Sequence, residues 1–313
     1  MSRKFIITGA TSIIGQSLLT LLKDNSEEII LVSRKVPNQG SDQPSRESNI
    51  LYRQWDLATE SMSDSGLVNN MSTNKKSVYN LIHCAPIWLL NEHVGELAEY
   101  GIKRVIAFSS SSIIGKSQTN SEKEKQIVEL LETAESVLIN ESTKGALNVT
   151  IFRPTMIYGH GQGMNLAFIA KMINRFGFFP VVTGGTGLRS PVHANDLAQA
   201  VCLAVSKEDT YDKTYVLSGQ QEMTYIEMVG KIFQALGKPV RIVQTPLFLF
   251  RWIIQIVGKL TKLPVDPEMA ERMRQDLNFD SLDAKQDFAY SPGPFLPNGS
   301  EDILPQQSED LTQ

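Results

Sequence analysis

The chain has few of the residues that build metal sites and disulfide frameworks. Its 313 residues include two cysteines, Cys84 and Cys202, and four histidines. Two cysteines cannot cross-link a domain of this size, and both lie in apolar runs, so we expect each to be a small buried hydrophobic residue. The His, Cys, Asp and Glu residues show no metal-ligand spacing, and we predict no metal site.

The chain also lacks a basic excess and long apolar runs. It has 30 basic and 34 acidic residues, a formal net charge of −4, which excludes broad nonspecific nucleic-acid binding. No apolar run reaches the roughly 18 uncharged residues that a membrane-spanning helix needs, and the N-terminus shows no signal-peptide cleavage region. With 42% hydrophobic residues and a mean hydropathy of −0.14, we expect a soluble, cytoplasmic, globular protein.

Strand-like and helix-like segments alternate through the first half of the chain. Buried strands separated by amphipathic segments predict an α/β fold with a doubly wound parallel sheet and helices on both faces. Near residue 155 the alternation stops, which indicates a smaller second lobe, and the polar C-terminal residues indicate a mostly disordered tail. We predict strands at 4–7, 28–32, 51–55, 78–84, 105–109 and 149–152, a first domain of 1–154 to which 181–206 return, a lobe of 155–180 and 207–290, and a tail of 291–313.

A glycine-containing turn lies between the first strand and the first helix. Gly9 allows a tight turn, and Gly15 allows the helix to pack close to the strand. The N–H groups that begin the helix then face an anion such as a pyrophosphate. Ser12 stands where the full fingerprint has its middle glycine, and its hydroxyl could donate to a phosphate. We predict a dinucleotide site here; the alternative is an ordinary strand-to-helix turn.

The residues after the second strand indicate which dinucleotide binds. A carboxylate there would accept hydrogen bonds from the adenosine ribose, but the chain continues with Ser33, Arg34 and Lys35. Arg34 and Lys35 could pair with a 2′-phosphate, or simply be solvated. We therefore predict NADP rather than NAD. Asp56, after the third strand, could accept from the adenine amino group or cap the helix that follows.

Five segments resemble the extended short-chain dehydrogenase/reductases, which include the NAD-dependent epimerases and dehydratases of nucleotide sugars. They are Thr8–Gly15, Asp56-Leu57, Phe108–Gly115, Phe152–Gly159 and Gly184–Ala198. The resemblance implies a Rossmann-type domain that binds the cofactor and a smaller C-terminal lobe that binds the substrate, a nucleotide sugar or another small carbonyl or hydroxyl compound. The predicted cofactor contacts are Thr8, Gly9, Thr11, Ser12, Ile13, Ile14, Gly15, Ser33, Arg34, Lys35, Asp56, Leu57, Cys84, Ala85, Pro86 and Ser109.

The chain departs from this family at its proton relay. Family members use a Ser or Thr after the fifth strand with a Tyr-x-x-x-Lys pair on the next helix, where the ammonium lowers the pKa of the tyrosine. Ser110 holds the serine position and Ser111 is its neighbour, a predicted substrate contact, but the Tyr and Lys positions fall on Ile127 and Leu131. Two aliphatic side chains cannot relay a proton. The sequence predicts an atypical oxidoreductase, or alternatively an NADP(H)-binding sensor or assembly protein without catalysis.

Several further residues allow more than one interpretation. Tyr158 is the best remaining phenol, and we predict a catalytic role for it beside Ser110. Arg189 is a predicted substrate contact, at the position where related epimerases bind a pyrophosphate, or a solvated loop residue. His83 could exchange protons or be structural. The apolar helix expected within 246–263 could be buried in the lobe, or could meet the substrate, a protein partner or a membrane surface. A homodimer is a further alternative.

Overall fold

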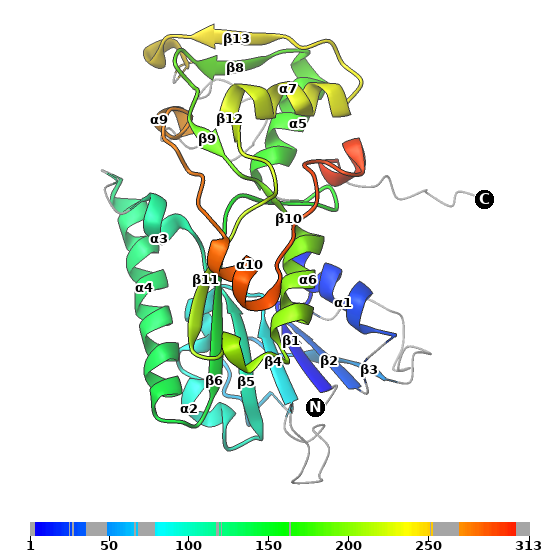
Figure 1. Ribbon diagram of the computed structural model, residues 1–313, viewed down its shortest axis with the longest axis vertical. Coiled ribbons are helices and arrows are strands. Elements are labelled where there is room, and N and C mark those ends of the chain that lie inside the picture. Colours follow the sequence, from blue (N-terminus) through cyan, green and yellow to red (C-terminus); the bar gives the residue numbers. More distant parts are fainter. Residues whose placement is uncertain are drawn as a thin grey trace, which may run out of the picture. The chain divides into compact units, whose positions relative to one another are not determined.

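The computed structural model describes residues 4–24, 26, 28–35, 49–65, 67, 79–116, 119, 121–162, 164–250, 252 and 269–304. The chain forms two compact units (Figure 1). Unit 1 comprises Met1–Pro154, Asn195–Leu217 and Ser281–Ser291, and unit 2 comprises Thr155–Ala194, Ser218–Asp280 and Pro292–Gln313. This division differs from the predicted one, because 181–194 stay in unit 2 while 207–217 and 281–291 return to unit 1.

Unit 1 is built on a seven-stranded parallel sheet. Its order is β11-β6-β5-β4-β1-β2-β3. The chain places β2 and β3 on one side of β1 and then crosses back to place β4 and the later strands on the other side. The doubly wound α/β fold is therefore confirmed, and each predicted strand forms at or near its predicted place. The strands are β1 (Lys4–Thr8), β2 (Glu28–Ser33), β3 (Ile50–Gln54), β4 (Tyr79–His83), β5 (Ile102–Phe108), β6 (Asn148–Pro154) and β11 (Lys213–Leu217).

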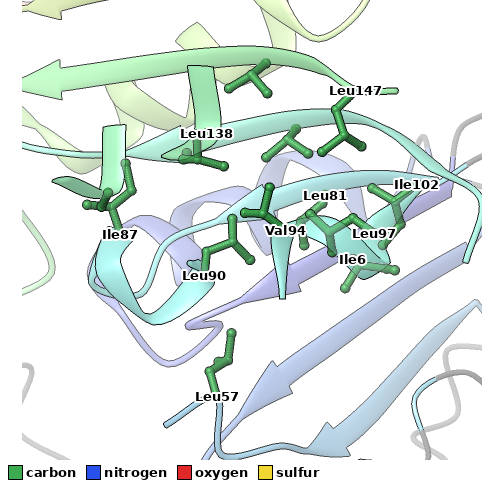
Figure 2. Close-up of a cluster of buried hydrophobic side chains, with 14 of the residues drawn as sticks. Ile6, Leu57, Leu81, Ile87, Leu90, Val94, Leu97, Ile102, Leu138 and Leu147 are labelled. Carbon is green, nitrogen blue, oxygen red and sulfur yellow. The ribbon is translucent and has the colours of Figure 1, made fainter. Parts of the chain in front are cut away.

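Helices cover both faces of this sheet, as its nearly continuous apolar strands require. Figure 1 shows α4 on one side and α1 and α6 on the other. The side chains of η2 and α2 pack with α4 and the strands in one hydrophobic cluster, part of which Figure 2 shows. The elements are α1 (Ile13–Leu22), η2 (Ile87–Leu90), α2 (Val94–Leu97), α3 (Ser112–Gly115), α4 (Glu122–Thr143), α6 (Ala194–Ala204), η3 (Glu208–Thr210) and α10 (Leu282–Phe288).

Unit 2 has its own core beneath short strand pairs. β7 pairs with β10 and β8 with β13, both in parallel, while β9 and β12 are antiparallel. Side chains of α5 and α7 fill the core with those of β8. The elements are β7 (Ile157–Tyr158), α5 (Met164–Phe176), β8 (Phe179–Val182), β9 (Leu188–Arg189), β10 (Val192–His193), β12 (Met223–Thr224), α7 (Tyr225–Ala235), β13 (Ile242–Thr245), α9 (Met269–Arg272) and η4 (Gly299–Asp302).

The prediction of a mostly disordered tail is wrong for residues 291–304. Phe295, Leu296 and Leu304 pack against the core of unit 2, and Ile303 is completely buried in it. The turn η4 also buries the carboxylate of Asp302. These few apolar residues are spaced among polar ones, so composition alone hid them. Residues 305–313 lie outside the described residues.

The prediction for the two cysteines is also wrong in part. Cys84 is half-buried at the end of β4, and Cys202 is exposed on α6. Leu197, Ala198 and Val201 lie on the buried face of α6. Cys202 directly follows Val201, and the helical repeat turns its side chain away from that face.

Candidate functional site

The first turn of unit 1 passes so close to the end of β4 that only glycine fits at residue 9. Gly9 has φ +71°, and a Cβ atom there would lie 2.5 Å from the backbone nitrogen of Ala85 and 2.7 Å from the carbonyl carbon of Cys84. A Cβ atom on Gly15 would lie 2.7 Å from the carbonyl oxygens of Gly9 and Ala10. Both glycines therefore close a compact turn around the start of α1, the type of turn in which the N–H groups of a helix N-terminus can face an anion.

Ser12 begins α1 as its capping residue. Its hydroxyl accepts a hydrogen bond from the backbone N–H of Gly15 at 3.1 Å. This bond uses an acceptor lone pair, so the hydroxyl proton can still be donated. Ser12 therefore stands at the position of the fingerprint's middle glycine and also caps the N-terminus of α1.

The end of β4 is fixed to the end of β1 by His83. The Thr8 hydroxyl lies 2.8 Å from Nδ1 of His83, and Nε2 of His83 lies 3.1 Å from the carbonyl oxygen of Pro86. A carbonyl oxygen only accepts, so Nε2 carries the proton and Nδ1 accepts from Thr8. Burial lowers the pKa of His83 to about 4. His83 is thus a neutral, structural residue near pH 7, and the structural reading of it is the one that the geometry supports.

The residues that follow β2 lie beside this turn. The Ala10 N–H donates to the carbonyl oxygen of Val32 at 3.1 Å, which joins the turn to the last part of β2. The Ser33 hydroxyl donates to the carbonyl oxygen of Lys35 at 2.7 Å, and the side chains of Arg34 and Lys35 are exposed. This loop offers two cations and, among residues 29–35, no carboxylate.

The end of β3 forms a second short turn. Asp56 Oδ1 accepts from the N–H of Ala58 at 3.1 Å, so this carboxylate orders a turn. The helix predicted for it to cap does not form in residues 57–65, and a contact with adenine stays a prediction. Nε2 of His93 lies 2.9 Å from the carbonyl oxygen of Leu57, and the His93 ring meets the Trp55 ring edge-on. These contacts hold residues 55–57 at the same sheet edge as the turn after β1, because the strands are parallel.

Four consecutive serines, Ser109 to Ser112, follow β5. The N–H of Ser109 donates to the carbonyl oxygen of Phe152 at 2.8 Å, and that of Ser111 to the carbonyl oxygen of Pro154 at 3.1 Å. The Ser110 hydroxyl donates to Oγ of Ser112 at 3.0 Å and accepts from the N–H of Ser112 at 3.1 Å. Ser110 therefore has a defined orientation at the start of α3.

The face of α4 that should carry the proton relay is aliphatic. Leu131 is buried in the core cluster of unit 1, and Ile127 packs against that cluster. One turn beyond Leu131, the carboxylate of Glu135 accepts from Nε of Arg153 at 3.0 Å, which fixes α4 against β6. These contacts fix the Ile127 and Leu131 side of α4 against the sheet of unit 1.

Tyr158 lies in the core of unit 2. Its side chain is 1% exposed, and its hydroxyl accepts from the N–H of Leu296 at 3.0 Å. The ring meets those of His193 and Phe295 edge-on. A catalytic role for Tyr158 stays a prediction, and its packing favours a structural one.

Arg189 is buried rather than solvated, with 2% of its surface exposed. Its Nη1 donates to the carbonyl oxygens of Leu188 and Gln275, both at 2.7 Å, and its Nη2 to that of Arg272. Burial lowers the pKa of Arg189 to about 10. The guanidinium is also 5.5 Å from the ring of Tyr225, a neighbour that no sequence motif indicated. A substrate contact through Arg189 stays a prediction.

Comparison with known proteins identifies the family. Residues 5–218 match the family model described as NAD dependent epimerase/dehydratase family. The chain belongs to this family.

The proteins to which the chain is similar include epimerases of UDP-sugars. The chain is 20% identical to a UDP-glucose 4-epimerase of Vibrio cholerae over 96% of this chain and 94% of that one. A solved structure of MoeE5 with UDP-glucose and NAD superposes with a TM-score of 0.67 at 18% identity, covering 96% and 97% of the two chains. UDP-glucuronic acid 4-epimerase of Bacillus cereus, with UDP-glucuronic acid and NAD, gives a TM-score of 0.68 at 16% identity, covering 96% and 98%.

Within the epimerase/dehydratase family, the predicted cofactor turn and the predicted relay positions of this chain can be located in the structure. The turn through Gly9 and Gly15, with its helix N-terminus, fits the pyrophosphate of a nicotinamide dinucleotide. The position of the relay serine is kept by Ser110. Ile127 and Leu131, at the positions predicted for the Tyr and Lys of the relay, supply neither a proton donor nor a cation, and the absence of the relay stays a prediction.

Proposed function

We propose that unit 1 binds NADP(H) and that the protein is an atypical epimerase/dehydratase-like oxidoreductase of a nucleotide sugar or a small carbonyl or hydroxyl compound. The observation that carries the proposal is the Gly9 turn, where a Cβ atom would collide with Ala85. Such a turn sets the backbone N–H groups of α1 against a pyrophosphate. The bound nicotinamide would supply the site for hydride transfer.

The preference for NADP(H) rests on the loop after β2. Arg34 and Lys35 are exposed there, and no acid takes the place of the carboxylate that would bind an unphosphorylated ribose. A guanidinium pairs with a phosphate in a fixed, bidentate geometry. The neighbouring structures named above were solved with NAD, so this preference would separate the chain from them.

The residues of this chain would bind and orient rather than move protons. The Ser110 hydroxyl, held by Ser112, could donate a hydrogen bond to a substrate oxygen. His83 is neutral and bonded through both ring nitrogens, so it offers no base near pH 7. A positioned base contributes about 10²–10⁴-fold to such reactions. Oxidation of a sugar hydroxyl should therefore be slow.

One observation favours a second candidate, an NADP(H)-binding sensor or assembly protein. Leu131 is not merely a neutral substitute at the lysine position but part of the hydrophobic core of unit 1. A buried leucine gives the position a packing role that a catalytic lysine could not share. If the protein is such a sensor or assembly protein, the oxidised and reduced cofactors would bind without reacting, and no turnover would occur.

Cofactor titration followed by a turnover assay tests the proposal. NADPH and NADH are titrated by calorimetry. UDP-glucose, UDP-glucuronic acid, a dTDP-sugar and simple aldehydes are then incubated with the oxidised or the reduced cofactor, and sugar products are separated by chromatography while the nicotinamide absorbance is followed. Product analysis is needed because an epimerase returns its cofactor to the starting redox state. We expect tight NADPH binding and slow turnover that falls further in Ser110→Ala, with Ser63→Ala, an exposed serine, as the control. Failure to bind either cofactor would overturn the proposal. NADPH binding without turnover on any substrate would select the second candidate.

A further inference from the structure

The most exposed large apolar side chains of the described residues lie close together in sequence, on unit 2. Phe248 is 71% exposed and Trp252 68%. Val240, Val243 and Leu249 are exposed as well. We call these five residues the apolar face. Single exposed apolar residues need no explanation, but five within thirteen residues of one another form a candidate interaction surface.

The local fold turns these side chains outward. β13 pairs with β8, and a helical turn follows it, in which the N–H of Phe250 donates to the carbonyl oxygen of Pro246 at 2.9 Å. Phe250 is buried in the core of unit 2 and Leu247 packs against that core, so Phe248 and Leu249 cannot also face it. Trp252 follows Phe248 by four residues and shares its side of the helix. Figure 1 shows this turn directly after β13, at one edge of unit 2.

The described residues that lead into the apolar face carry charge of one sign. Residues 228–250 include no acidic residue and three basic ones, Lys231, Lys238 and Arg241. The whole chain, by contrast, has a formal net charge of −4. The segment is therefore a local cationic exception.

The neighbouring end of α5 adds to this charge. Lys238 Nζ donates to the carbonyl oxygen of Asn174 at 3.2 Å, and the N–H of Phe179 donates to the carbonyl oxygen of Arg241 at 3.0 Å, so α5 and β8 lie against the start of β13. Arg175 is exposed there, 5.7 Å from the ring of Phe176. The chain has no acidic residue between Glu141 and Asp196 either. Basic side chains therefore border the apolar face without carboxylates from these segments.

We propose that the apolar face binds peripherally to a membrane surface that contains anionic phospholipids. Exposed Trp and Phe side chains enter the boundary between headgroups and acyl chains, while Lys and Arg beside them attract anionic headgroups. In the part of the chain that the structure describes, no helix is long and apolar enough to cross a membrane.

The charge argues against a second copy of the chain as the occupant. A two-fold symmetric contact sets the same surface of each copy against the other. Arg241 and its basic neighbours would then face one another without acidic partners. An anionic lipid surface neutralises them instead.

Vesicle sedimentation with the full-length protein tests this surface. Vesicles of phosphatidylcholine alone are compared with vesicles that also contain phosphatidylglycerol. The double variant Phe248→Ser/Trp252→Ser removes the apolar anchors, and Arg241→Glu reverses one basic residue. The matched control is Leu130→Ser/Leu282→Ser, which changes two exposed leucines of unit 1. Circular dichroism melting verifies that each variant is folded.

We expect binding only to the anionic vesicles, and weaker binding as salt rises. Each aromatic side chain that inserts into the membrane changes the partition coefficient by roughly tenfold or more, so the vesicle affinity of the double variant should fall about a hundredfold. Arg241→Glu should lose about fivefold or more, and the leucine control should bind as the unmodified protein does. No binding to anionic vesicles, equal binding to neutral ones, or equal losses in both double variants would overturn the proposal. A solution dimer that only Phe248→Ser/Trp252→Ser dissociates would assign the face to a second copy instead.

Discussion

Nε2 of His193 lies 3.1 Å from Oδ1 of Asp302, and both side chains are buried in unit 2. The same carboxylate accepts from the backbone N–H and the side-chain amide of Asn298, both at 2.9 Å. Residues 298–302 are thereby tied to β10, far away in sequence. The C-terminal segment is part of the core of unit 2 rather than an appendage.

Substitution of Asp302 by Asn should therefore destabilise the protein. A hydrogen bond to a charged group contributes about 1.5–3 kcal/mol, and a loss in that range is expected in the free energy of unfolding. Urea denaturation followed by tryptophan fluorescence measures it. Glu301→Gln is the matched control because Glu301 is exposed and adjacent. Equal stability of the two variants would contradict the role given to Asp302.

The same carboxylate should give the protein an acid-sensitive step. Burial by itself would raise the pKa of Asp302, but the hydrogen bonds from His193 and Asn298 outweigh it and hold the pKa below the ordinary value. Because the folded state binds this proton less readily, the stabilisation is present above about pH 4 and is lost as the pH falls through the folded pKa. Urea midpoints measured across that range should fall less steeply in Asp302→Asn than in the unmodified protein. Parallel curves would show that another group causes the loss.

His83 should lose its stabilising effect at a higher pH than Asp302. Its folded pKa, lowered to about 4 by burial, lies below the value of about 6.5 for an unfolded chain. The unfolded state therefore takes up the proton first, and stability falls as the pH drops from about 6.5 towards 4. NMR of the folded protein should show a His83 ring that does not titrate between about pH 8 and 5.5. A titration midpoint near 6.5 would show that the ring is solvated.

The parallel sheet and the cofactor turn could be predicted because their signals are local. Buried strands read as short apolar runs, and the turn through Gly9 and Gly15 has a fixed spacing between a strand and a helix. The prediction that the relay positions are aliphatic also comes from counting along one helix, and it stays a prediction; the structure adds that Leu131 is buried in the core.

The C-terminal segment could not be predicted in this way. The contact of Asp302 with His193 joins residues 109 apart in sequence, and Ile303 and Leu304 are one short apolar pair in a polar stretch. The neighbours of Arg189 come from two distant segments, through the backbone of Arg272 and Gln275 in one and the ring of Tyr225 in the other. Backbone carbonyl acceptors leave no pattern in a sequence, so the sequence could not predict that Arg189 is buried.

Reversal of charge at Arg34 should change the cofactor preference. If Arg34 pairs with a 2′-phosphate, Arg34→Glu removes a charge-assisted contact of about 1.5–3 kcal/mol, and the preference for NADPH over NADH should fall by at least about tenfold. Calorimetric titration of both cofactors measures the ratio. Lys103→Glu, an exposed charge reversal on β5, controls for the change in net charge. Equal affinities for the two cofactors in the unmodified protein would rule out the predicted preference.

Leu131 and Leu130 together test whether the aliphatic face of α4 has a packing role. The two residues are adjacent, yet Leu131 is 4% exposed and Leu130 is 46% exposed. Leu131→Ala should reduce the free energy of unfolding by about 2–5 kcal/mol, because it leaves a cavity among the core side chains that contact it. Leu130→Ala has the same chemistry and helix propensity and should change it by no more than about 0.5 kcal/mol. Urea denaturation of the two variants gives the difference directly. If they are equally stable, Leu131 does not belong to the core, and the argument that packing has replaced the lysine of the proton relay fails.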